Sequence, residues 1–564
     1  MLKYFQIISY RKQVIFFIII LGIIIYSNSL DCSFNFDDSN SIVRNTAIKN
    51  IDNIKEIWKF WPTRFLTYLS FAFNYHFHNL NVFGYHVINL FIHLTASIMV
   101  WWFIFLTLST KVMKNSLLSK NAHLIAFFCG VLFLVHPVQI ESVTYITQRA
   151  TSLGGLFYIS AMAFYVKARL LRINDIQPAI SIQFYVLSLF SAIFAMFSKE
   201  MVITLPLMLL LYELLFFIKR KYIALIPFFG VASLLPLTMI MTKSISFTNM
   251  TRTSESSAMI QPIHYLLTQF RVIITYIRIL FFPVNQNLDY NYPLIKTCLQ
   301  LNAVLSLTAI IFILFFAFKF KIKYKMLSFG IFWFFISLLP ESSIIPIKDV
   351  IFEHRLYIPS IGFIIFFVCG IFYIMSEKHK KLLLSSLVLI ISILSIMTYM
   401  RNNIWKTPFS LWNDVIKKSP NKSRPYLSRG LFYYMKGDLD LAIADYTRAI
   451  KLKPDYAQVY INRSISYRSK GLLDKALADI NKSIYYKPDL AEAYNTRANL
   501  FFLKGEMDQA ISDYNKALKI NPAYGEAYFN RALVYFHKDE IEKYQADLNK
   551  AESFGIKIKH NLEK

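Results

Sequence analysis

Charged residues are scarce in this chain of 564 residues. They make up 17% of it, whereas an ordinary soluble domain carries roughly 25%. Hydrophobic residues reach 55%. This combination excludes a disordered chain and argues against a single soluble globule.

Two other residue classes are thinly represented. The chain has four cysteines, none of them in a CxxC pair, so a disulfide scaffold, a paired-cysteine zinc site and thioredoxin-like chemistry are not indicated. Acidic residues number 34 against 61 basic ones, which gives a formal net charge of +27. Such an excess can indicate a nucleic-acid partner, but the position of the basic residues along the chain indicates a different cause.

Apolar segments dominate the first 400 residues. A membrane helix needs about 20 mostly apolar residues. Eleven segments qualify or come close: 14–30, 83–107, 123–137, 150–167, 182–198, 200–218, 222–242, 302–320, 326–340, 357–375 and 382–400. Basic residues concentrate in every second connection between them, as at Lys219, Arg220 and Lys221. The positive-inside rule assigns these connections to the cytoplasm, so the basic excess is an orientation signal and no nucleic-acid surface is predicted.

This alternation predicts a multi-pass membrane protein with a cytoplasmic N-terminus. After eleven spans, the C-terminal part lies outside the cytoplasm, in the periplasm, at the cell exterior or in the ER lumen. The segment 262–282 is apolar but contains Arg271 and Arg278. We expect an interfacial or re-entrant helix there, on the outer face. The alternative is a true span, with an error elsewhere in the count.

A 34-residue period runs through the C-terminal part, which is richer in charge. Five residue types recur at this spacing: Pro420, Pro454, Pro488 and Pro522; Tyr426, Tyr460, Tyr494 and Tyr528; Arg429, Arg463, Arg497 and Arg531; Gly437, Gly471 and Gly505; Ala442, Ala476 and Ala510. The pattern resembles the tetratricopeptide repeat, a helix pair with small residues at the contact and glycine at the turn. We therefore predict an all-α fold, with a membrane bundle at 1–400, a linker at 401–422, four repeats at 423–558 and a tail at 559–564.

The first helix of each repeat lines the concave surface of such an array. Equivalent positions on it hold Ser428, Asn462, Thr496 and Asn530. These side chains are candidates for binding an extended peptide backbone, and a solvated polar surface is the alternative. In either case the repeats indicate a protein partner or substrate and no chemistry of their own.

Ionisable residues gather in four segments predicted to lie on the outer face, where the membrane makes such residues costly and therefore of functional interest. The four segments contain Asp37 and Asp38; His136, Glu141 and Arg149; Lys199 and Glu200; and Glu353, His354 and Arg355. Each group has a structural alternative, such as a solvated turn, a helix stop at the headgroup level or a salt bridge at a tight turn. Their shared side of the membrane favours phosphate-ester chemistry on a lipid-anchored donor.

The chain resembles the transmembrane and tetratricopeptide-repeat (TMTC) O-mannosyltransferase family. The resemblance lies in the FDD of the first outer segment, in HPVQIESVTYITQRATSLGGLFYI, FSKEMVITLPLMLLLYELLF, PVNQNLDYNYP and EHRLYIPSIGF, and in the repeats that follow. It covers nearly the whole chain, although the animal members carry more than four repeats. It implies a glycosyltransferase-C fold, a polyprenyl-phosphate sugar donor and action on the non-cytoplasmic face.

The resemblance also implies roles for the clustered residues. Asp37 or Asp38 would be the general base that deprotonates the acceptor hydroxyl, so that attack on the anomeric carbon inverts its configuration. The donor phosphate would be stabilised by Arg149, Lys199 and Arg355. These groups would be oriented by His136, Glu141, Glu200, Glu353 and His354. No cofactor is implied with certainty, and a divalent metal on Asp37 and Asp38 stays an open alternative.

Three functions are compatible with these patterns. The first, which we favour, is transfer of a sugar such as mannose to Ser or Thr of proteins, with the repeats presenting the acceptor or a partner. The second keeps the fold but glycosylates a lipid or an envelope glycan. The third is a non-catalytic membrane scaffold whose repeats recruit envelope or secretory proteins.

Overall fold

The computed structural model describes residues 2–173, 177–242, 260–297, 299–343, 345–347, 349–374 and 379–556. These residues form α-helices and short 3₁₀ or π turns, and no strand occurs among them, so the all-α prediction is confirmed. The predicted tail at 559–564 lies outside the described residues. The chain divides into two compact units, the first made mainly of residues up to Asp414 and the second of residues from Val415 onward.

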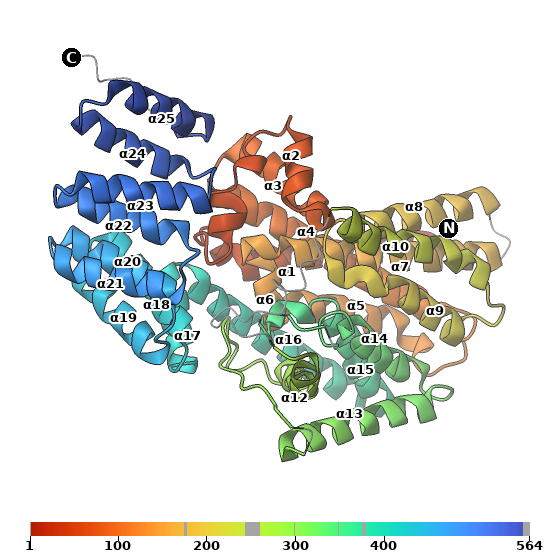
Figure 1. The fold of residues 1–564 in the computed structure, drawn as a ribbon. Coiled ribbons are helices and arrows are strands. Elements are labelled where there is room, and N and C mark those ends of the chain that lie inside the picture. The colour runs from red at the N-terminus through yellow and green to blue at the C-terminus, as the bar shows by residue number, and fades with distance from the viewer. Residues whose placement is uncertain are drawn as a thin grey trace. The chain divides into compact units, whose positions relative to one another are not determined.

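The first unit is built from helices of very different lengths (Figure 1). In chain order they are α1 (Leu2–Tyr26), α2 (Ile54–Phe60), α3 (Phe65–His78), α4 (Val82–Leu108), α5 (Ala122–Val135), α6 (Ile140–Val143), α7 (Arg149–Ile173), α8 (Pro178–Met196), α9 (Leu205–Phe216), α10 (Ile226–Met241), α12 (Pro262–Phe281), α13 (Leu301–Phe320), α14 (Lys325–Leu338), α15 (Pro359–Ile374) and α16 (Lys380–Asn402).

Helices occupy all eleven segments that the sequence marks as membrane spans, but fewer than eleven can cross a membrane alone. Among the described residues, six helical stretches are long and apolar enough: Tyr10–Ser29, Val82–Leu108, Pro178–Met196, Tyr222–Met241, Leu301–Phe320 and Lys380–Trp405. A seventh is obtained if Ser119–Val135 and Pro137–Val143, which are bent by 51° at their junction, count as one span. The predicted count of eleven is therefore corrected to six or seven.

The shortfall has two physical reasons. α9, α14 and α15 contain 12, 14 and 16 residues, fewer than a full crossing needs. α7 is long enough, with 25 residues, but it is rich in small and hydroxylated side chains and is buried along most of its length. A helix enclosed by other helices does not need an apolar surface toward lipid. α12 is a continuous helix of 20 residues and is not among the candidate spans, and its interfacial position stays a prediction.

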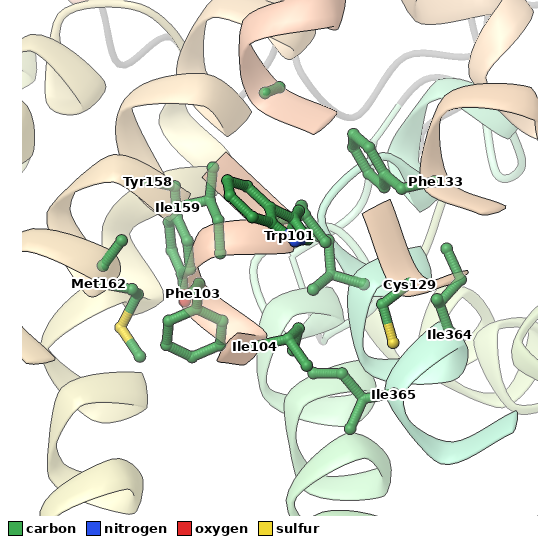
Figure 2. Packing of buried hydrophobic residues seen from close by; sticks show 14 of the residues in the cluster. Trp101, Phe103, Ile104, Cys129, Phe133, Tyr158, Ile159, Met162, Ile364 and Ile365 are labelled. Atoms are coloured by element: carbon green, nitrogen blue, oxygen red, sulfur yellow. The ribbon is translucent and has the colours of Figure 1, made fainter. Parts of the chain in front are cut away.

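The core of the first unit lies where α4 packs against α5 and α7, with α15 on the far side of α5 (Figure 2). Large side chains from all four helices meet there, including Trp101, Phe103, Phe133, Tyr158 and Ile365. Burial of a side chain of this size contributes about 1.5–3 kcal/mol. The same core fixes the helix ends that carry the ionisable residues described below.

α14 and α15 approach each other closely at two glycines. A Cβ atom added at Gly330 would lie 2.5 Å from the carbonyl oxygen of Gly362, so no larger residue fits there. Small residues at a helix contact let two backbones come together. As a result, the two ends of the connection between α14 and α15 lie close together.

The second unit consists of paired helices that follow one another in order (Figure 1). They are α18 (Ser423–Lys436), α19 (Leu439–Leu452), α20 (Ala457–Ser469), α21 (Leu473–Tyr486), α22 (Ala491–Leu503), α23 (Met507–Ile520), α24 (Gly525–His537) and α25 (Ile541–Ser553); α17 (Pro408–Lys418) precedes them. The turns of the first three pairs contain Gly437, Gly471 and Gly505, each at positive φ. In the fourth pair Asp539 takes this place, with φ of 59°.

Candidate functional site

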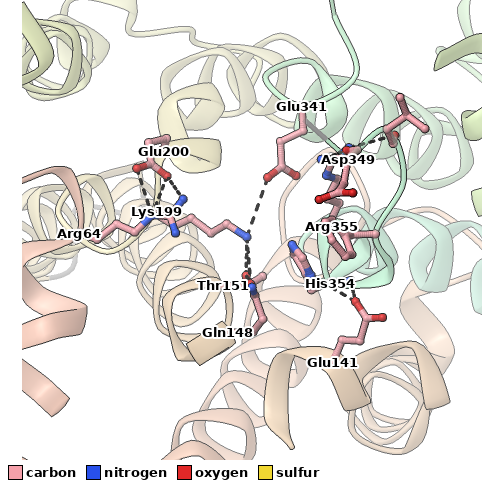
Figure 3. A network of polar contacts seen from close by, with 12 residues as sticks. Arg64, Glu141, Gln148, Thr151, Lys199, Glu200, Glu341, Asp349, His354 and Arg355 are labelled. Carbon is pink, nitrogen blue, oxygen red and sulfur yellow. Dashed lines mark hydrogen bonds and ion pairs between the residues drawn. The ribbon is translucent and has the colours of Figure 1, made fainter. Parts of the chain in front are cut away.

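One end of the helices in the first unit carries most of the predicted ionisable residues. Figure 3 shows Lys199 and Glu200 from the turn after α8, Glu141 from α6, and His354 and Arg355 from the turn before α15. Gln148 and Thr151, at the start of α7, lie between these groups. The structure thus brings together residues that are up to 213 positions apart in the chain.

Lys199 lies at the centre of this cluster and is only 4% exposed. Its ammonium group donates to Thr151 Oγ1 at 2.6 Å and to Gln148 Oε1 at 3.4 Å, and lies 3.9 Å from Glu341 Oε1 (Figure 3). Burial lowers the pKa of Lys199 to about 8, and the nearby Glu341 carboxylate opposes this shift. Lys199 is therefore a buried cation whose hydrogen bonds go to neutral oxygens, while the carboxylates of Glu341 and Glu200 act on it without a close contact.

Glu200 does not pair with its neighbour Lys199 but with Arg64. The guanidinium group of Arg64 donates from Nε to both carboxylate oxygens at 3.1 Å and from Nη2 to Oε2 at 2.9 Å. Thr63 donates its hydroxyl to the same carboxylate at 2.7 Å. This ion pair joins the segment before α3 to the turn after α8, so Glu200 holds Arg64 beside the cluster.

Arg64 and Glu341 were not singled out from the sequence. Both stand in segments predicted to face outward, in WPTRF and in PESS, so the same criterion of an ionisable residue beside a membrane helix applies to them. Their pairing could not be read from the sequence, because Arg64 and Glu200 are 136 residues apart.

The turn before α15 presents Glu353, His354 and Arg355 in three different directions. Glu353 accepts hydrogen bonds from Gln286 Nε2 at 2.6 Å, the Asn287 amide at 2.7 Å and the Tyr290 hydroxyl at 2.5 Å. Burial raises the pKa of Glu353. Its carboxyl group thereby fastens the segment that follows α12, and it does not contact the Lys199 cluster.

The guanidinium group of Arg355 closes its own turn. It donates to the carbonyl oxygens of Val350 at 3.1 Å and Asp349 at 2.7 Å. Arg355 is 2% exposed, and its positive charge lies close enough to His354 to disfavour protonation of that ring. Lys348 from the same segment lies outside the described residues. Arg355 thus contributes a buried positive charge on the side of the cluster opposite Arg64 (Figure 3).

The two adjacent aspartates are separated by the fold. Asp38 is 1% exposed, and its carboxyl group accepts the backbone N–H of Asn35 at 2.9 Å, that of Thr147 at 2.8 Å and the hydroxyl of Thr147. Burial raises the pKa of Asp38 to about 7, although these hydrogen bonds favour the ionised form. Asp37 is exposed, and its backbone N–H donates to the hydroxyl of Tyr145 at 2.9 Å. Asp38 is therefore enclosed, while Asp37 is accessible.

One short stretch connects the aspartates to the Lys199 cluster. Tyr145 and Thr147 contact Asp37 and Asp38, and Gln148 and Thr151 contact Lys199. Residues 145–151 therefore contact both groups of predicted site residues.

Arg149 belongs to residues 145–151, but its hydrogen bonds go to neighbouring helices. Its guanidinium group donates to Asn89 Oδ1 at 2.6 Å, to both oxygens of Ser70 at 3.1–3.2 Å and to the carbonyl of Tyr85 at 3.0 Å. It also lies over the ring of Phe71, 4.5 Å from the centroid. All three nitrogens bind protein oxygens, so this geometry argues against the predicted role in phosphate binding. Arg149 instead joins α7 to α3 and α4.

His136 likewise serves the scaffold. Its Nδ1 accepts the backbone N–H of Val138 at 3.2 Å, and its Nε2 donates to the carbonyl of Leu280 at 3.0 Å. Both ring nitrogens are used, so His136 ties the end of α5 to the end of α12. It also lines a mainly apolar pocket formed by Leu132, Leu280, Phe281, Phe363, Ile364, Phe367, Ile390 and Leu394.

The structure gives little support for a divalent metal at the aspartate pair. Both oxygens of Asp38 already accept hydrogen bonds from N–H or O–H groups. Across the described residues, no group of three or more His, Cys, Asp or Glu side chains is arranged to hold a metal ion. A metal on Asp37 and Asp38 stays a prediction.

The four predicted peptide-binding positions differ in exposure. Ser428, Asn462 and Asn530 are partly exposed on α18, α20 and α24, whereas Thr496 on α22 is 5% exposed. Asn530 donates to Asn495 Oδ1 at 3.2 Å, so neighbouring repeats are linked by their amides. Three of the four positions are thus accessible to a partner.

Comparison with family models confirms the repeats. A model described as the tetratricopeptide repeat matches residues 457–490, and one described as TPR repeat matches residues 430–464 and 498–539. Among solved structures, the crystal structure of MamA covers 26% of this chain and 85% of its own, at 23% identity and a TM-score of 0.24.

Curated relatives confirm the resemblance to the TMTC O-mannosyltransferases. A protein O-mannosyl-transferase of Caenorhabditis elegans is 27% identical over 433 residues, which is 73% of this chain and 59% of that protein. Human TMTC3 is 27% identical over 72% of this chain and 48% of its own length, and human TMTC4 26% over 76% and 64%. The chain therefore spans about half to two thirds of the length of these relatives.

Proposed function

We propose that this protein is a membrane glycosyltransferase. It transfers a sugar, with mannose as the first candidate, from a polyprenyl phosphate to hydroxyl groups of Ser and Thr in proteins. The observation that carries the proposal is the single site in which an accessible aspartate and a buried cationic cluster share residues 145–151. The named activity of the similar proteins supports the same reaction.

In this mechanism Asp37 is the general base. It is exposed, whereas Asp38 is enclosed by three hydrogen bonds. The acceptor hydroxyl gives its proton to Asp37 as its oxygen forms a bond to the anomeric carbon. The bond from that carbon to the phosphate oxygen breaks at the same time, and the electron pair leaves with the polyprenyl phosphate. Attack from the side opposite the leaving group inverts the anomeric configuration.

The negative charge that develops on the leaving phosphate needs fixed positive charge nearby. Lys199 and Arg355 supply it from two sides of the cluster, whereas the charge of Arg64 is taken up by its ion pair with Glu200 (Figure 3). Because Lys199 is held chiefly by neutral oxygens, it can take a phosphate oxygen as a stronger partner. Arg149 is left out of this step.

The chemical character of each surface suggests where the protein acceptor and the polyprenyl chain bind. The tetratricopeptide repeats bind a protein, either the acceptor or a partner that delivers it, through positions such as Asn462 and Asn530. The polyprenyl chain lies along the apolar helices, and the pocket beside His136 is one place for its first isoprene units. The reaction takes place on the non-cytoplasmic side, which agrees with the basic residues in the opposite connections.

The test is direct transfer by the purified full chain in lipid nanodiscs. The protein is incubated with polyprenyl-phosphate mannose and secreted proteins as acceptors, and mass spectrometry maps hexose on Ser or Thr. Radiolabelled mannose is followed in parallel into protein and into lipid extract. Label in protein supports the proposal, label in lipid alone identifies a lipid acceptor instead, and no transfer with any donor contradicts an enzymatic role.

A further inference from the structure

The imidazole ring of His354 is fixed by Glu141. Glu141 Oε2 accepts the backbone N–H of His354 at 2.9 Å and lies 3.2 Å from the ring Nδ1 of the same residue. Because the backbone N–H and the ring Nδ1 of His354 both contact the same oxygen of Glu141, the ring has little freedom to rotate. Stacking on the ring of Phe352, with 5.0 Å between the centroids, limits rotation further. The tautomer with the proton on Nδ1 fits this contact with Glu141 Oε2, and in that tautomer Nε2 presents a lone pair.

Nε2 of His354 has no hydrogen-bond partner within the described part of the chain, although the residue is 7% exposed. Figure 3 shows the ring between Glu141 on one side and the side chains of Lys199, Glu341 and Arg355 on the other. Burial together with the charges of Lys199, Arg355 and Arg64 holds the pKa of His354 well below its usual range. The ring is thus neutral, and Nε2 can only accept a hydrogen bond.

An acceptor in this position restricts what can lie against it. A phosphate oxygen is itself an acceptor and would be repelled by the lone pair, so the phosphate belongs on the cations and not on His354. A sugar hydroxyl is a donor and fits. We propose that Nε2 of His354, positioned by Glu141, accepts a hydrogen bond from one hydroxyl group of the transferred sugar and thereby takes part in selecting that sugar. This inference rests on the proposed function and adds a sugar-recognition residue to it.

The experiment compares donors that each lack one hydroxyl group of the sugar. Steady-state kcat/KM is measured for the parent polyprenyl-phosphate sugar and for its deoxy analogues, with wild type, His354→Phe and His354→Gln. In the wild type, removal of the hydroxyl that faces His354 should lower kcat/KM about tenfold. In His354→Phe, which keeps the stacking but has no acceptor, that one analogue should be used as well as the parent. His354→Gln, which can offer an amide oxygen, should restore part of the preference.

The control variant is His76→Gln, because His76 is exposed on α3 and touches no site residue. It should keep the wild-type preference among the analogues. The inference is overturned if His354→Phe lowers kcat/KM for every analogue by the same factor, which is the result of a purely structural role. It is also overturned if His354→Phe weakens binding of polyprenyl phosphate without a sugar, which would place the ring on the phosphate. Absence of any sugar transfer by the wild type contradicts the proposed function itself, so the two failures are distinguishable.

Discussion

The two units of this protein use buried and half-buried charges in opposite ways. In the second unit one ion pair recurs: Arg429, Arg463, Arg497 and Arg531 each bind an aspartate 16 residues further on with two hydrogen bonds of 2.7–2.9 Å. In the first unit, by contrast, each contact of the candidate site described above occurs once. His354 binds Glu141 across 213 residues, and Arg64 binds Glu200 across 136.

This difference separates charges that build a fold from charges available for chemistry. Each repeat arginine has a carboxylate in ideal two-pronged geometry, so its charge is fully used within the fold. Lys199 has neutral hydrogen-bond partners, and the nearest carboxylate oxygen lies 3.9 Å away. Incomplete compensation of this kind is typical of functional sites. Substitutions at Asp37, Arg463 and Lys199 test the distinction, and one at a repeat turn tests the fold of the second unit alone.

The largest effect is expected at Asp37. Asp37→Asn removes the proton acceptor and should lower kcat about a thousandfold, with little change in stability because the side chain is exposed. Transfer of labelled sugar to protein measures kcat, and thermal unfolding in detergent measures stability. Asp52→Asn, an exposed aspartate of the same connection, is the matched control and should be fully active. Wild-type kcat in Asp37→Asn would exclude this residue as the base.

The next effect concerns the repeated ion pair. Arg463→Met leaves the carboxylate of Asp479, which is 5% exposed, without its two hydrogen bonds and should lower the stability of the second unit by about 2 kcal/mol. Hydrogen exchange of α20 and α21 in the full chain measures this loss. Asp474→Asn breaks the pair with Lys504, in which the carboxylate is 93% exposed, and should cost less than about 0.5 kcal/mol. Equal losses in the two variants would contradict the distinction between used and surface charges.

A smaller effect is expected from pH at Lys199. The ammonium form is present below its pKa of about 8 and is lost above it, so kcat/KM for the donor should fall about tenfold per pH unit at higher pH. Lys199→Arg keeps its charge over the whole range and should move this decline to higher pH. Lys59→Arg, at an exposed lysine paired with Glu56, should leave the profile unchanged. An unaltered profile in Lys199→Arg would show that another group titrates.

The smallest effect lies at a repeat turn. Asp539 adopts φ of 59° where the three preceding repeats have glycine at φ of 75–85°. A side chain in this left-handed conformation costs about 1 kcal/mol, so Asp539→Gly should raise the stability of the last repeat by that amount. Gly505→Ala, the reverse change one repeat earlier, should lower it. Hydrogen exchange of α22 to α25 measures both, and the same sign for both would contradict the conformational reason.

The sequence was most informative where structure is local. Helix pairs, turn glycines and repeat spacing follow from a 34-residue period, because every unit meets the same neighbours. The all-α character and the positions of the eleven helical segments were also predicted correctly. The number of spans was overestimated, because α9, α14 and α15 are apolar but have only 12, 14 and 16 residues, and α7 is long enough but not sufficiently apolar.

The site was predictable in kind but not in detail. An ionisable residue beside an apolar helix is a visible signal, and it marked Lys199, His354 and both aspartates, whose roles stay predictions. It also marked Arg149 and His136, which have the same signal but whose side chains form hydrogen bonds with neighbouring helices and turns. Only the packing of distant segments decides between these outcomes. Arg64 and Glu341 carry the same signal and were not marked, and their pairing could not be read because their partners lie far away along the chain.

The stretch 145–151 has a further consequence for reading variants of this protein. Its first residues hold the aspartates, and its last residues hold the ammonium group of Lys199. A substitution that shifts this backbone therefore alters the surroundings of the carboxylates and of the ammonium group together, and its effect belongs to neither group alone.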